Sequence, residues 1–410
     1  MRSRRVIASV GIAALLVCAA PVQAWGPDGQ IAVVSAGTHL LGQDSAFNLR
    51  QFLRYVVQGA SMTDEERRER YPSFSVDPVN AIQREMVLMQ SVRTDRIDPY
   101  YAHRLGELGA LVASATAPLA ASDAATIRAQ YYADADRAIE RTNLRPEPRK
   151  LVDPRAYFSF VRSEAFKNDQ TIIVHYRGGI GFRGFALSSL PLDASRSVNA
   201  VADVWYTVLT AQMPMYDQPV TARREYVLDA IDYYLAAGNL EEVRMQYTFA
   251  TNKQMMDDDL RKEIGDRFFG AGHYDRAMEE YQKILASRPD RRDVVERVAE
   301  YYQQAGDMAM EMEDLEEARE AYERAVAANS LLTDAQKKLL DVEKLIAERD
   351  RRLIVQRGAT DEAQEFENRA EESAMRRDYA RAISLLQEAE ARYASVTPEF
   401  PAEAEVARLG

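Results

Sequence analysis

The side chains that could carry out covalent or metal chemistry are few in this chain. It has four histidines, His39, His103, His175 and His273, and a single cysteine, Cys18. A serine or cysteine hydrolase is a poor fit, because the sequence has no nucleophile elbow and its cysteine lies in a leader-like segment. Zinc would have to be held by imidazole and carboxylate groups. The residue types alone therefore favour no enzyme class.

Gly179, Gly181 and Gly184 match a dinucleotide-binding fingerprint in letters only. We expect no helix to open at the third glycine, so a phosphate group would meet no helix N-terminus there. β-Branched and aromatic residues at 171–176 and 182–187 flank the glycines and predict a small β-hairpin instead. Nucleotide binding is therefore not expected.

The segment 1–24 has the pattern of a signal peptide. Three arginines precede an apolar run from Val6 to Ala20, and small residues precede the predicted cleavage point after Ala24. We expect an exported protein, periplasmic or secreted. An uncleaved membrane anchor, which would need about 20 apolar residues, and a lipid anchor on Cys18, which would need a small residue where Val17 stands, are the alternatives.

Cleavage would remove the three arginines and the only cysteine. The formal net charge would then change from −12 to −15, and no disulfide could form. Nucleic acid and anionic membranes repel an acidic protein, so neither is an expected partner. The 410 residues, 47% of them hydrophobic, are enough for two or three domains of about 100 to 200 residues each.

Three segments of the front half have a distinctive composition. They are the predicted mature start at Trp25, VVQGASMTDEE at 56–66, and LGALVASATAPLAASD at 108–123, where Pro118 and small residues interrupt an apolar helix. Together they resemble the fold of zinc-dependent phospholipase C, which the single-strand-specific zinc nucleases share. The resemblance implies a helical domain over residues 25–212 that closes with a helix at 197–209, and we expect Trp205 of that helix in the core.

The same resemblance implies that most zinc ligands are missing. It places the metal ligands at Trp25, through its backbone amine and carbonyl, and at the positions of Gln30, Asp64, Ala110, Ser114 and Ala120. Most of these side chains are not zinc donors, and a methyl group cannot coordinate a metal. We therefore expect no cofactor, and a pseudoenzyme-like domain with vestigial positions.

The alternative is a zinc-dependent phosphoesterase or phospholipase with reorganised ligands. It would use Trp25, Asp64 and either His39 or His103. For His103, a partly buried polar side chain near a helix start is the simpler interpretation.

The stretch 258–291 has the residue spacing of a tetratricopeptide repeat. Small residues at Gly265 and Ala277 allow two antiparallel helices to pack closely. Large residues at Phe268 and Tyr281 fill the seam with a neighbouring repeat. One such unit cannot bury its apolar face alone, so further repeats must flank it.

Counting from this repeat divides the back half of the chain. A linker at 213–223 leads into a weaker repeat at 224–257. A third repeat at 292–332 has its second helix seven residues late, because MAMEMED lengthens the hairpin. Seven residues is close to two helical turns, so the buried face is preserved. A long charged helix at 333–356, which either packs on a repeat or meets another protein, precedes a last repeat at 363–396 with Arg377 in the glycine position.

The first helices of such repeats line a groove that can bind a partner. The residues expected to face it are mostly acidic: Asp229, Asp232, Asp259, Lys262, Glu263, Asp266, Phe269, Glu296, Arg297 and Glu300. These positions lack the set of Lys, Arg and Asn that clamps a C-terminal carboxylate. A basic or amphipathic peptide, with Phe269 as an apolar contact, is the expected partner. The alternative is that the acids form a solvated helix face.

The sequence thus predicts a mainly α protein in which a helical domain with a small β-hairpin precedes an α-solenoid of tetratricopeptide repeats. The expected function is non-catalytic protein–protein interaction, such as scaffolding an envelope complex. Besides the zinc enzyme, a self-associating structural subunit is the other alternative.

Overall fold

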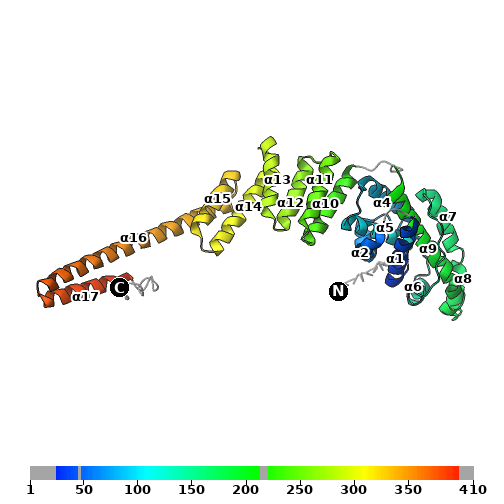
Figure 1. The fold of residues 1–410 in the computed structure, drawn as a ribbon, viewed down its shortest axis with the longest axis horizontal. Coiled ribbons are helices and arrows are strands. Elements are labelled where there is room, and N and C mark those ends of the chain that lie inside the picture. The colour runs from blue at the N-terminus through cyan, green and yellow to red at the C-terminus, as the bar shows by residue number, and fades with distance from the viewer. Residues whose placement is uncertain (1–24, 45–47, 213–219, 397–410) are drawn as a thin grey trace, which may run out of the picture. The chain divides into compact units, whose positions relative to one another are not determined.

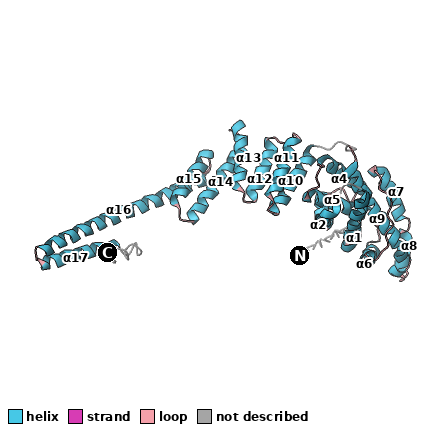
Figure 2. Ribbon diagram, viewed as in Figure 1, coloured by secondary structure: helices cyan, strands magenta, loops and turns pink. Residues whose placement is uncertain are grey.

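The computed structural model describes residues 25–44, 48–212 and 220–396, so the predicted signal peptide lies outside the described residues. The chain divides into two compact units, residues 1–256 and 257–410. Throughout the described ranges every regular element is a helix, and no strand is found there (Figure 2). The prediction of a mainly α protein is confirmed. No described helix is long and apolar enough to cross a membrane.

In the first unit, helices pack around a central helix, α5 (Figure 1). In chain order the elements are α1 (Pro27–Asp44), η1 (Leu49–Phe52), α2 (Leu53–Ala60), α3 (Asp64–Arg70), α4 (Pro78–Val92), α5 (Pro99–Thr116), α6 (Ala125–Ile139), α7 (Pro154–Phe166), α8 (Asp169–Arg177), η2 (Gly181–Arg183), α9 (Phe185–Thr210), α10 (Val220–Ala236) and α11 (Leu240–Asn252).

Helices α4, α5 and α7 each begin with the dipeptide Asp-Pro. The carboxylates of Asp77, Asp98 and Asp153 accept a hydrogen bond from the backbone N–H three residues later. Proline has no backbone N–H, but at the next position this costs no hydrogen bond, because the first N–H groups of a helix have no partner within it. The start of each helix is therefore determined locally.

Helix α5 is buried along nearly its whole length because small residues let its neighbours approach. At the crossing with α2, a Cβ on Gly106 would overlap the carbonyl of Val56, and a Cβ on Gly59 would overlap the carbonyl of His103. The two backbones are thus in direct contact. The helix ends at Thr116, two residues before Pro118, since a residue preceding proline disfavours the helical region.

Trp205 of α9 is fully buried, as predicted. Its indole N–H donates to the carbonyl of Leu105 at 2.8 Å. The ring lies against Gly37 of α1 and Gly109 of α5, where a Cβ would come within 3.1 Å or less of ring atoms. The three longest apolar helices of the unit therefore meet at one tryptophan.

The predicted β-hairpin is wrong. Residues 171–176 belong to α8, and 182–187 span η2 and the start of α9. The glycines end α8 instead of turning a hairpin: Gly179 has φ 76°, its N–H bonds the carbonyl of Tyr176, and the N–H of Ile180 bonds that of His175. This is the Schellman arrangement that caps helices. Burial of Ile172 and Ile173 within the helical bundle overrides their preference for strands.

A helix also opens directly after Gly184, contrary to the expectation from the sequence. The preceding element is a helix and not a strand, so the dinucleotide-binding context is still missing. The first amide of α9, that of Phe185, already donates to Nδ1 of His175 at 3.0 Å.

The second unit consists of helix pairs. Its described elements are α12 (Asp258–Gly270), α13 (Tyr274–Ser287), α14 (Arg292–Glu311), α15 (Leu315–Ala328), α16 (Thr333–Met375) and α17 (Tyr379–Val396). Together with α10 and α11 of the first unit they make four antiparallel pairs.

Each pair turns in the same way. A residue in the left-handed region ends the first helix: Gly238 (φ 66°), Gly272 (79°), Glu313 (61°) or Arg377 (65°). The amide that follows it bonds the carbonyl five residues earlier, at 2.8 to 3.0 Å. Arg377 thus occupies the glycine position, as predicted.

The seven extra residues of the third repeat lengthen the helical hairpin within its first helix, α14. Gly306 touches Tyr322 as Gly265 touches Tyr281, with a built Cβ 2.5 and 2.7 Å from the ring. Gly306 is therefore the small residue of the repeat, although a step of one 34-residue period from Gly265 leads to Ala299. Two extra turns of helix bring both residues to nearly the same face, and Ala299 is buried as well.

The predicted boundary between a charged helix at 333–356 and a repeat starting at 363 is not found. Helix α16 runs unbroken over both segments and then pairs with α17 (Figure 1). Gly358 has open space around its Cα, and a lone glycine in a helix costs only about 1 kcal/mol.

Candidate functional site

Four of the positions where the resemblance expects a metal ligand are buried in the first unit: Trp25, Gln30, Ala110 and Ser114. Trp25 is buried, with φ 53°, and its indole N–H donates to Oγ of Ser197 at 3.3 Å. The hydroxyl of Thr116 donates to the same oxygen at 3.0 Å. The Trp25 side chain is thus fixed in the core by α5 and α9.

Gln30 and Ser114 are brought together by the fold. The Ser114 hydroxyl donates to Oε1 of Gln30 at 3.2 Å, and the Gln30 amide donates to the carbonyl of Ala60 at 2.6 Å. The guanidinium of Arg67, on α3, donates to the same Oε1 at 3.4 Å. An amide, a hydroxyl and a guanidinium therefore meet in the place where the resemblance expects two metal ligands.

This set does not fit zinc. Its groups are weak donors, and the positive charge of Arg67 would repel a cation. Ala110 is buried in α5, Ala120 follows that helix, and the side chain of Asp64 lies outside the described residues. Within the described ranges no group of three or more His, Cys, Asp and Glu side chains is placed to hold a metal ion.

The two histidines of the alternative enzyme are placed differently. His39 is exposed on α1, and its carbonyl accepts a hydrogen bond from Arg50. His103 lies within the first two turns of α5, with Nε2 3.3 Å from Oε1 of Glu107. It also lies against Tyr100 and Tyr233, with ring centroids 6.2 and 5.4 Å away.

A cluster of buried charges surrounds Arg104, which sequence reasoning missed. Its guanidinium bonds both carboxylate oxygens of Glu85 at 2.7 and 2.8 Å and lies 3.1 Å from Glu107. The hydroxyl of Tyr71 donates to Glu107 at 2.9 Å. The only sequence signal was the presence of charged residues on the buried faces of two apolar helices.

The carboxylates keep Arg104 charged. Burial alone would lower the pKa of Arg104, but Glu85 and Glu107 hold it well above its usual value. Burial acts to raise the pKa of Glu107, but the hydrogen bond with His103 and the charge of Arg104 bring it below its usual value. The cluster is therefore a network of buried ion pairs, in which burial also raises the pKa of Glu85.

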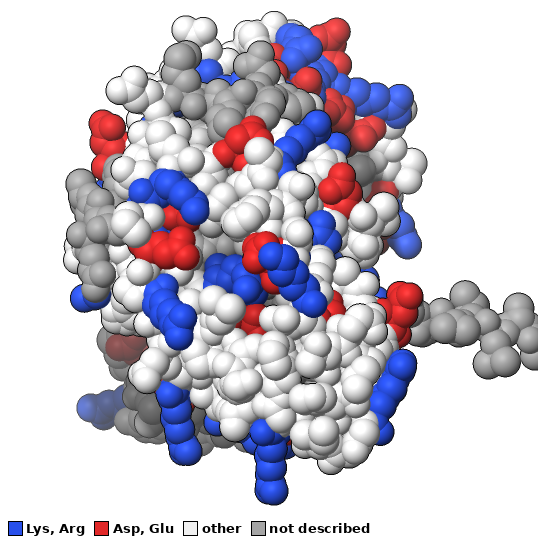
Figure 3. Space-filling view, turned by 90° about the vertical axis from the view of Figure 1, so that its right-hand side faces the viewer, with Lys and Arg blue, Asp and Glu red and all other residues white. Residues whose placement is uncertain are grey.

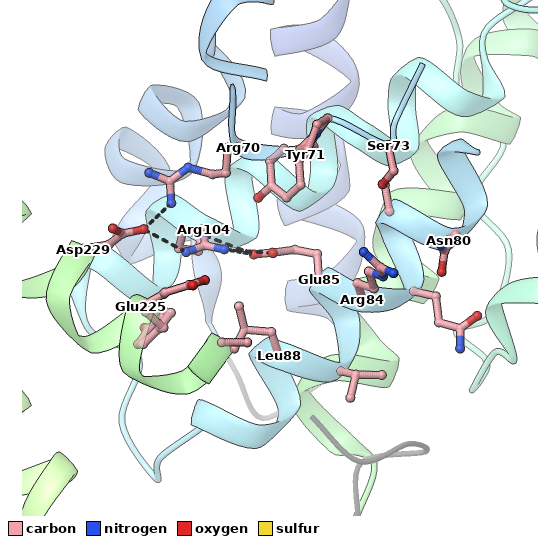
Figure 4. A pocket seen from close by; sticks show the side chains of 16 residues that line it. Arg70, Tyr71, Ser73, Asn80, Arg84, Glu85, Leu88, Arg104, Glu225 and Asp229 are labelled. Carbon is pink, nitrogen blue, oxygen red and sulfur yellow. Dashed lines mark hydrogen bonds and ion pairs between the residues drawn. The ribbon is translucent and has the colours of Figure 1, made fainter. Parts of the chain in front are cut away.

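A pocket of about 680 Å³ opens beside this cluster, between the α3–α4 connection, α4, α5 and α10 (Figure 4). Asp229 reaches into it from α10, and Oδ2 lies 2.8 Å from Arg70 and 3.9 Å from Arg104. Asp229, predicted to face a partner groove, therefore binds the front helices of its own chain.

Further contacts attach the first repeat to those helices. The Tyr234 hydroxyl donates to Asp98 at 2.7 Å and accepts from the amide of Tyr100 at 3.0 Å. Arg96 pairs with Glu242 of α11 at 2.6 Å. The pair α10–α11 thus belongs to the first compact unit, whereas Asp232, on the same helix, is exposed.

The predicted groove residues of the second unit form a repeating ion-pair motif. Asp266 accepts from the hydroxyl of Tyr281 at 2.7 Å and pairs with Lys262 and with Arg297 of the next repeat at 2.7 and 3.3 Å. Asp307 does the same with Tyr322 at 2.6 Å and Lys338 at 2.9 Å. The aspartates therefore join neighbouring repeats.

The other predicted groove residues lie nearer the surface. Asp259 pairs with Arg291 at 2.7 Å, Glu296 with Arg292 at 2.9 Å and Glu300 with Arg297 at 2.7 Å. Glu263 is exposed. These acids are thus neutralised in part by arginines of the same unit, which sequence spacing alone did not show.

Phe269 begins a row of partly exposed aromatic rings that the sequence analysis did not identify as a group. Phe269, Tyr274, Tyr301 and Tyr302 follow one another with ring centroids 5.1 to 5.8 Å apart. Arg297 lies 5.7 Å from the Phe269 ring, so the row already accepts a cation. Burial and the nearby Asp275 raise the pKa of Tyr301.

A different surface lies on α7 to α9 of the first unit. Phe160, Val174 and Ile180 each expose more than half of their surface. Viewed from that side, the molecule has broad uncharged areas, with Lys and Arg side chains along the lower edge (Figure 3). Phe160 thus provides an exposed aromatic ring outside the aromatic row.

Comparison with known proteins identifies one segment. Residues 299–330 match the family model described as tetratricopeptide repeat. This segment holds the second half of α14 and the whole of α15, with Gly306 and Tyr322 at their contact. No curated protein and no solved structure matches the chain, so these comparisons lend no support to the phospholipase resemblance.

Proposed function

We propose that this chain, a helical protein of the tetratricopeptide-repeat type, is a non-catalytic scaffold that binds a partner polypeptide through the repeats of its second unit. The match of residues 299–330 carries the proposal, because such repeats bind proteins. The aromatic row is the surface we assign to the partner. Partly exposed aromatic rings are the residues that most often dominate binding energy at protein interfaces.

The charges beside the row favour a basic or amphipathic partner segment. Asp259, Glu263 and Asp275 lie on the same two helices as Phe269 and Tyr274. A lysine or arginine of the partner could pair with these acids and stack on the rings, as Arg297 does within the chain.

Hydrogen bonds at the expected metal positions of the front domain support a non-catalytic role. Gln30, Ser114 and Arg67 satisfy one another where the resemblance would need metal ligands. Export to the periplasm or the exterior is part of the proposal, on the strength of the leader-like segment 1–24. N-terminal sequencing of the natural protein tests it, since we expect the mature chain to begin at Trp25.

The binding proposal is tested by affinity capture from the envelope extract of the source cell. The mature chain, the double variant Phe269→Ala/Tyr301→Ala and the control Phe160→Ala are compared by quantitative mass spectrometry. We expect a partner that the control retains and the double variant recovers at least about tenfold less, which corresponds to about 1.4 kcal/mol. Equal recovery by both variants would remove the aromatic row from the proposal.

Metal analysis and light scattering separate the other classes. Stoichiometric zinc, removed by a chelator together with a hydrolytic activity, would favour the phosphoesterase. Concentration-dependent self-association of the purified mature chain would favour a structural subunit.

A further inference from the structure

The backbone conformation of Trp25 is unusual for a bulky residue. Its side chain is almost fully buried and its indole donates to Ser197, so the core fixes its position. Its φ of 53° lies in the left-handed region. Residues other than glycine are rarely found there, because the Cβ comes too close to the backbone of the preceding residue. The peptide bond to Ala24 therefore places strain on a residue that the core holds in place.

The first turn of α1 lies directly against the carboxylate of Asp136, on α6. The amide of Gly29 donates to Oδ1 of Asp136 at 3.0 Å. A Cβ on Gly29 would lie 2.6 Å from that oxygen and 3.5 Å from Cβ of Trp25, and a Cβ on Gly26 would lie 1.9 Å from Oδ2. The two glycines thus leave the room that the carboxylate occupies beside Trp25.

This carboxylate has no cation beside it in the part of the chain that the structure describes. No lysine, arginine or histidine there forms an ion pair with Asp136, and Asp28 adds a second negative charge nearby. Burial raises the pKa of Asp136, although the amides of Gly26, Asp28 and Gly29 stabilise its charged form. A positive charge at the start of α1 would therefore be stabilised.

Cleavage after Ala24 creates a positive charge at this place. Hydrolysis of the peptide bond consumes one water molecule, leaves a carboxyl group on Ala24 and leaves an α-amine on Trp25, which is protonated near pH 7. Three bonds separate the nitrogen of Trp25 from that of Gly26, so the two atoms are at most about 3.7 Å apart. The Gly26 amide itself bonds Asp136, so the ammonium group lies within reach of the carboxylate.

We propose that proteolytic removal of residues 1–24 completes the first unit, because the new α-ammonium group of Trp25 pairs with Asp136. Cleavage also releases the strain, since no preceding residue then opposes the left-handed conformation of Trp25. A single residue left before Trp25 restores the strain and moves the charge away from Asp136. The inference rests on the export that the proposed function includes, and it adds a consequence of cleavage for the stability of the fold.

Unfolding of purified chains with defined N-termini tests the pairing. The full mature chain, beginning at Trp25, is compared with a chain that also keeps Ala24. Each is made with Asp136 and as Asp136→Asn, where asparagine keeps an acceptor for the amides but carries no charge. Chemical denaturation is followed by tryptophan fluorescence, which reports on the first unit because Trp25 and Trp205, the two tryptophans of the chain, are buried there.

The matched control is Asp134→Asn, the same change two residues earlier on α6. The carboxylate of Asp134 bonds Tyr176 of α8 and Arg137 instead of the start of α1. Both chains are also made with this substitution.

We expect the retained Ala24 to raise the equilibrium constant for unfolding at least about tenfold, through strain and the displaced charge, both with Asp136 and in Asp134→Asn. In Asp136→Asn only the strain remains, so the factor should be at least about three times smaller. The same factor in all three backgrounds would overturn the ion pair. No effect of Ala24 in any of them would overturn both parts of the proposal.

The reactivity of the α-amine gives a second measurement, on the chain that begins at Trp25. Acetic anhydride reacts only with the unprotonated amine, and an ion pair with Asp136 keeps the amine protonated. We expect Asp136→Asn, with near-ultraviolet circular dichroism showing that it is folded, to be acetylated at Trp25 at least about threefold faster than the other two proteins. Mass spectrometry of the N-terminal peptide measures the rates, and equal rates would contradict the pairing.

These experiments are separate from the test of export. A natural protein that begins at another residue would contradict the proposed export, and N-terminal sequencing shows this. The purified chains have N-termini fixed by their preparation, so their unfolding and acetylation support or overturn the pairing of Trp25 with Asp136 in either case.

Discussion

Charged residues in the two units are used differently. In the first unit Arg104, Glu85 and Glu107 are almost fully buried and bind one another. In the second unit Asp266 and Asp307 lie along the seams between repeats, partly exposed, and each accepts a hydrogen bond from a tyrosine and pairs with a cation of the following helix pair. A buried charge whose partner is removed has no water to replace it, whereas a partly exposed one does.

The difference predicts how each unit responds to substitution. The first unit has one core in which α5 touches α2, α4 and α9. Removing a contact in that core should therefore destabilise the whole unit. In the second unit each helix pair contacts only its neighbours, so removing one contact should destabilise only the seam in which it lies. Three substitutions test this contrast.

The largest effect is expected for Arg104→Met. It leaves Glu85 and Glu107 buried without their cation, which we expect to cost about 3 to 5 kcal/mol. Chemical denaturation of the mature chain, followed by a signal from the first unit, measures the change. Arg70→Met is the control, because the Arg70 side chain is 35% exposed and its loss should cost about 1 kcal/mol or less.

Adding Glu85→Leu to Arg104→Met should recover part of the loss, since the pair would then be apolar. An Arg104→Met protein as stable as the Arg70→Met protein would show that the buried network is not what distinguishes the first unit.

An intermediate effect is expected from Asp169, and it depends on pH. Burial raises the pKa of Asp169 to about 6, although the carboxylate accepts a hydrogen bond from the amide of Leu119. The folded state therefore binds this proton more tightly than the unfolded state, whose carboxyl titrates near pH 4. The stabilisation is complete below about pH 4 and is lost as pH rises through about 6.

We expect the first unit to lose about 2 kcal/mol over this range, and Asp169→Asn to lack that part of the pH dependence. Asparagine keeps the acceptor for Leu119 and carries no charge. Unfolding curves at pH 4 and pH 7 for both proteins make the measurement. Parallel pH profiles would show that Asp169 does not contribute.

The smallest effect is expected in the repeats. Tyr322→Phe removes a hydrogen bond to Asp307, which keeps Lys338 as a partner, so we expect a cost of about 1 kcal/mol. Tyr281→Phe should cost the same, because Asp266 keeps Lys262 and Arg297. Tyr393→Phe removes a longer bond, with its hydroxyl 3.5 Å from Glu367, and should cost less.

Thermal unfolding monitored in the second unit gives these values. A cost of several kcal/mol for Tyr322→Phe alone would show that the seams are not equivalent and that the third repeat holds the unit together.

The repeats could be predicted from the sequence because their signals are local. Gly265, Ala277 and Tyr281 recur at fixed spacing, and residue size alone specifies which positions pack. The place of the extra turns in the third repeat could not be predicted, since a shift of seven residues leaves the same face buried. The register was decided by which small residue, Ala299 or Gly306, touches Tyr322.

The candidate site was predicted less well than the fold. Spacing along α10 and α12 showed which residues share a face, and Asp229, Asp266 and Phe269 were named on that ground. It could not show what else would occupy that face. Arg70 and Arg104 bind Asp229 from helices more than a hundred residues earlier in the chain.

The sequence by itself determined the helical class, the antiparallel pairs and the burial of Trp205, because each depends on neighbours a few residues apart or on one large apolar side chain. Only the tertiary structure decided that residues 171–176 are helical, that Gln30 bonds Ser114, and that the predicted groove acids join repeats to one another. These outcomes depend on contacts between distant segments, where burial and charge pairing outweigh local preference.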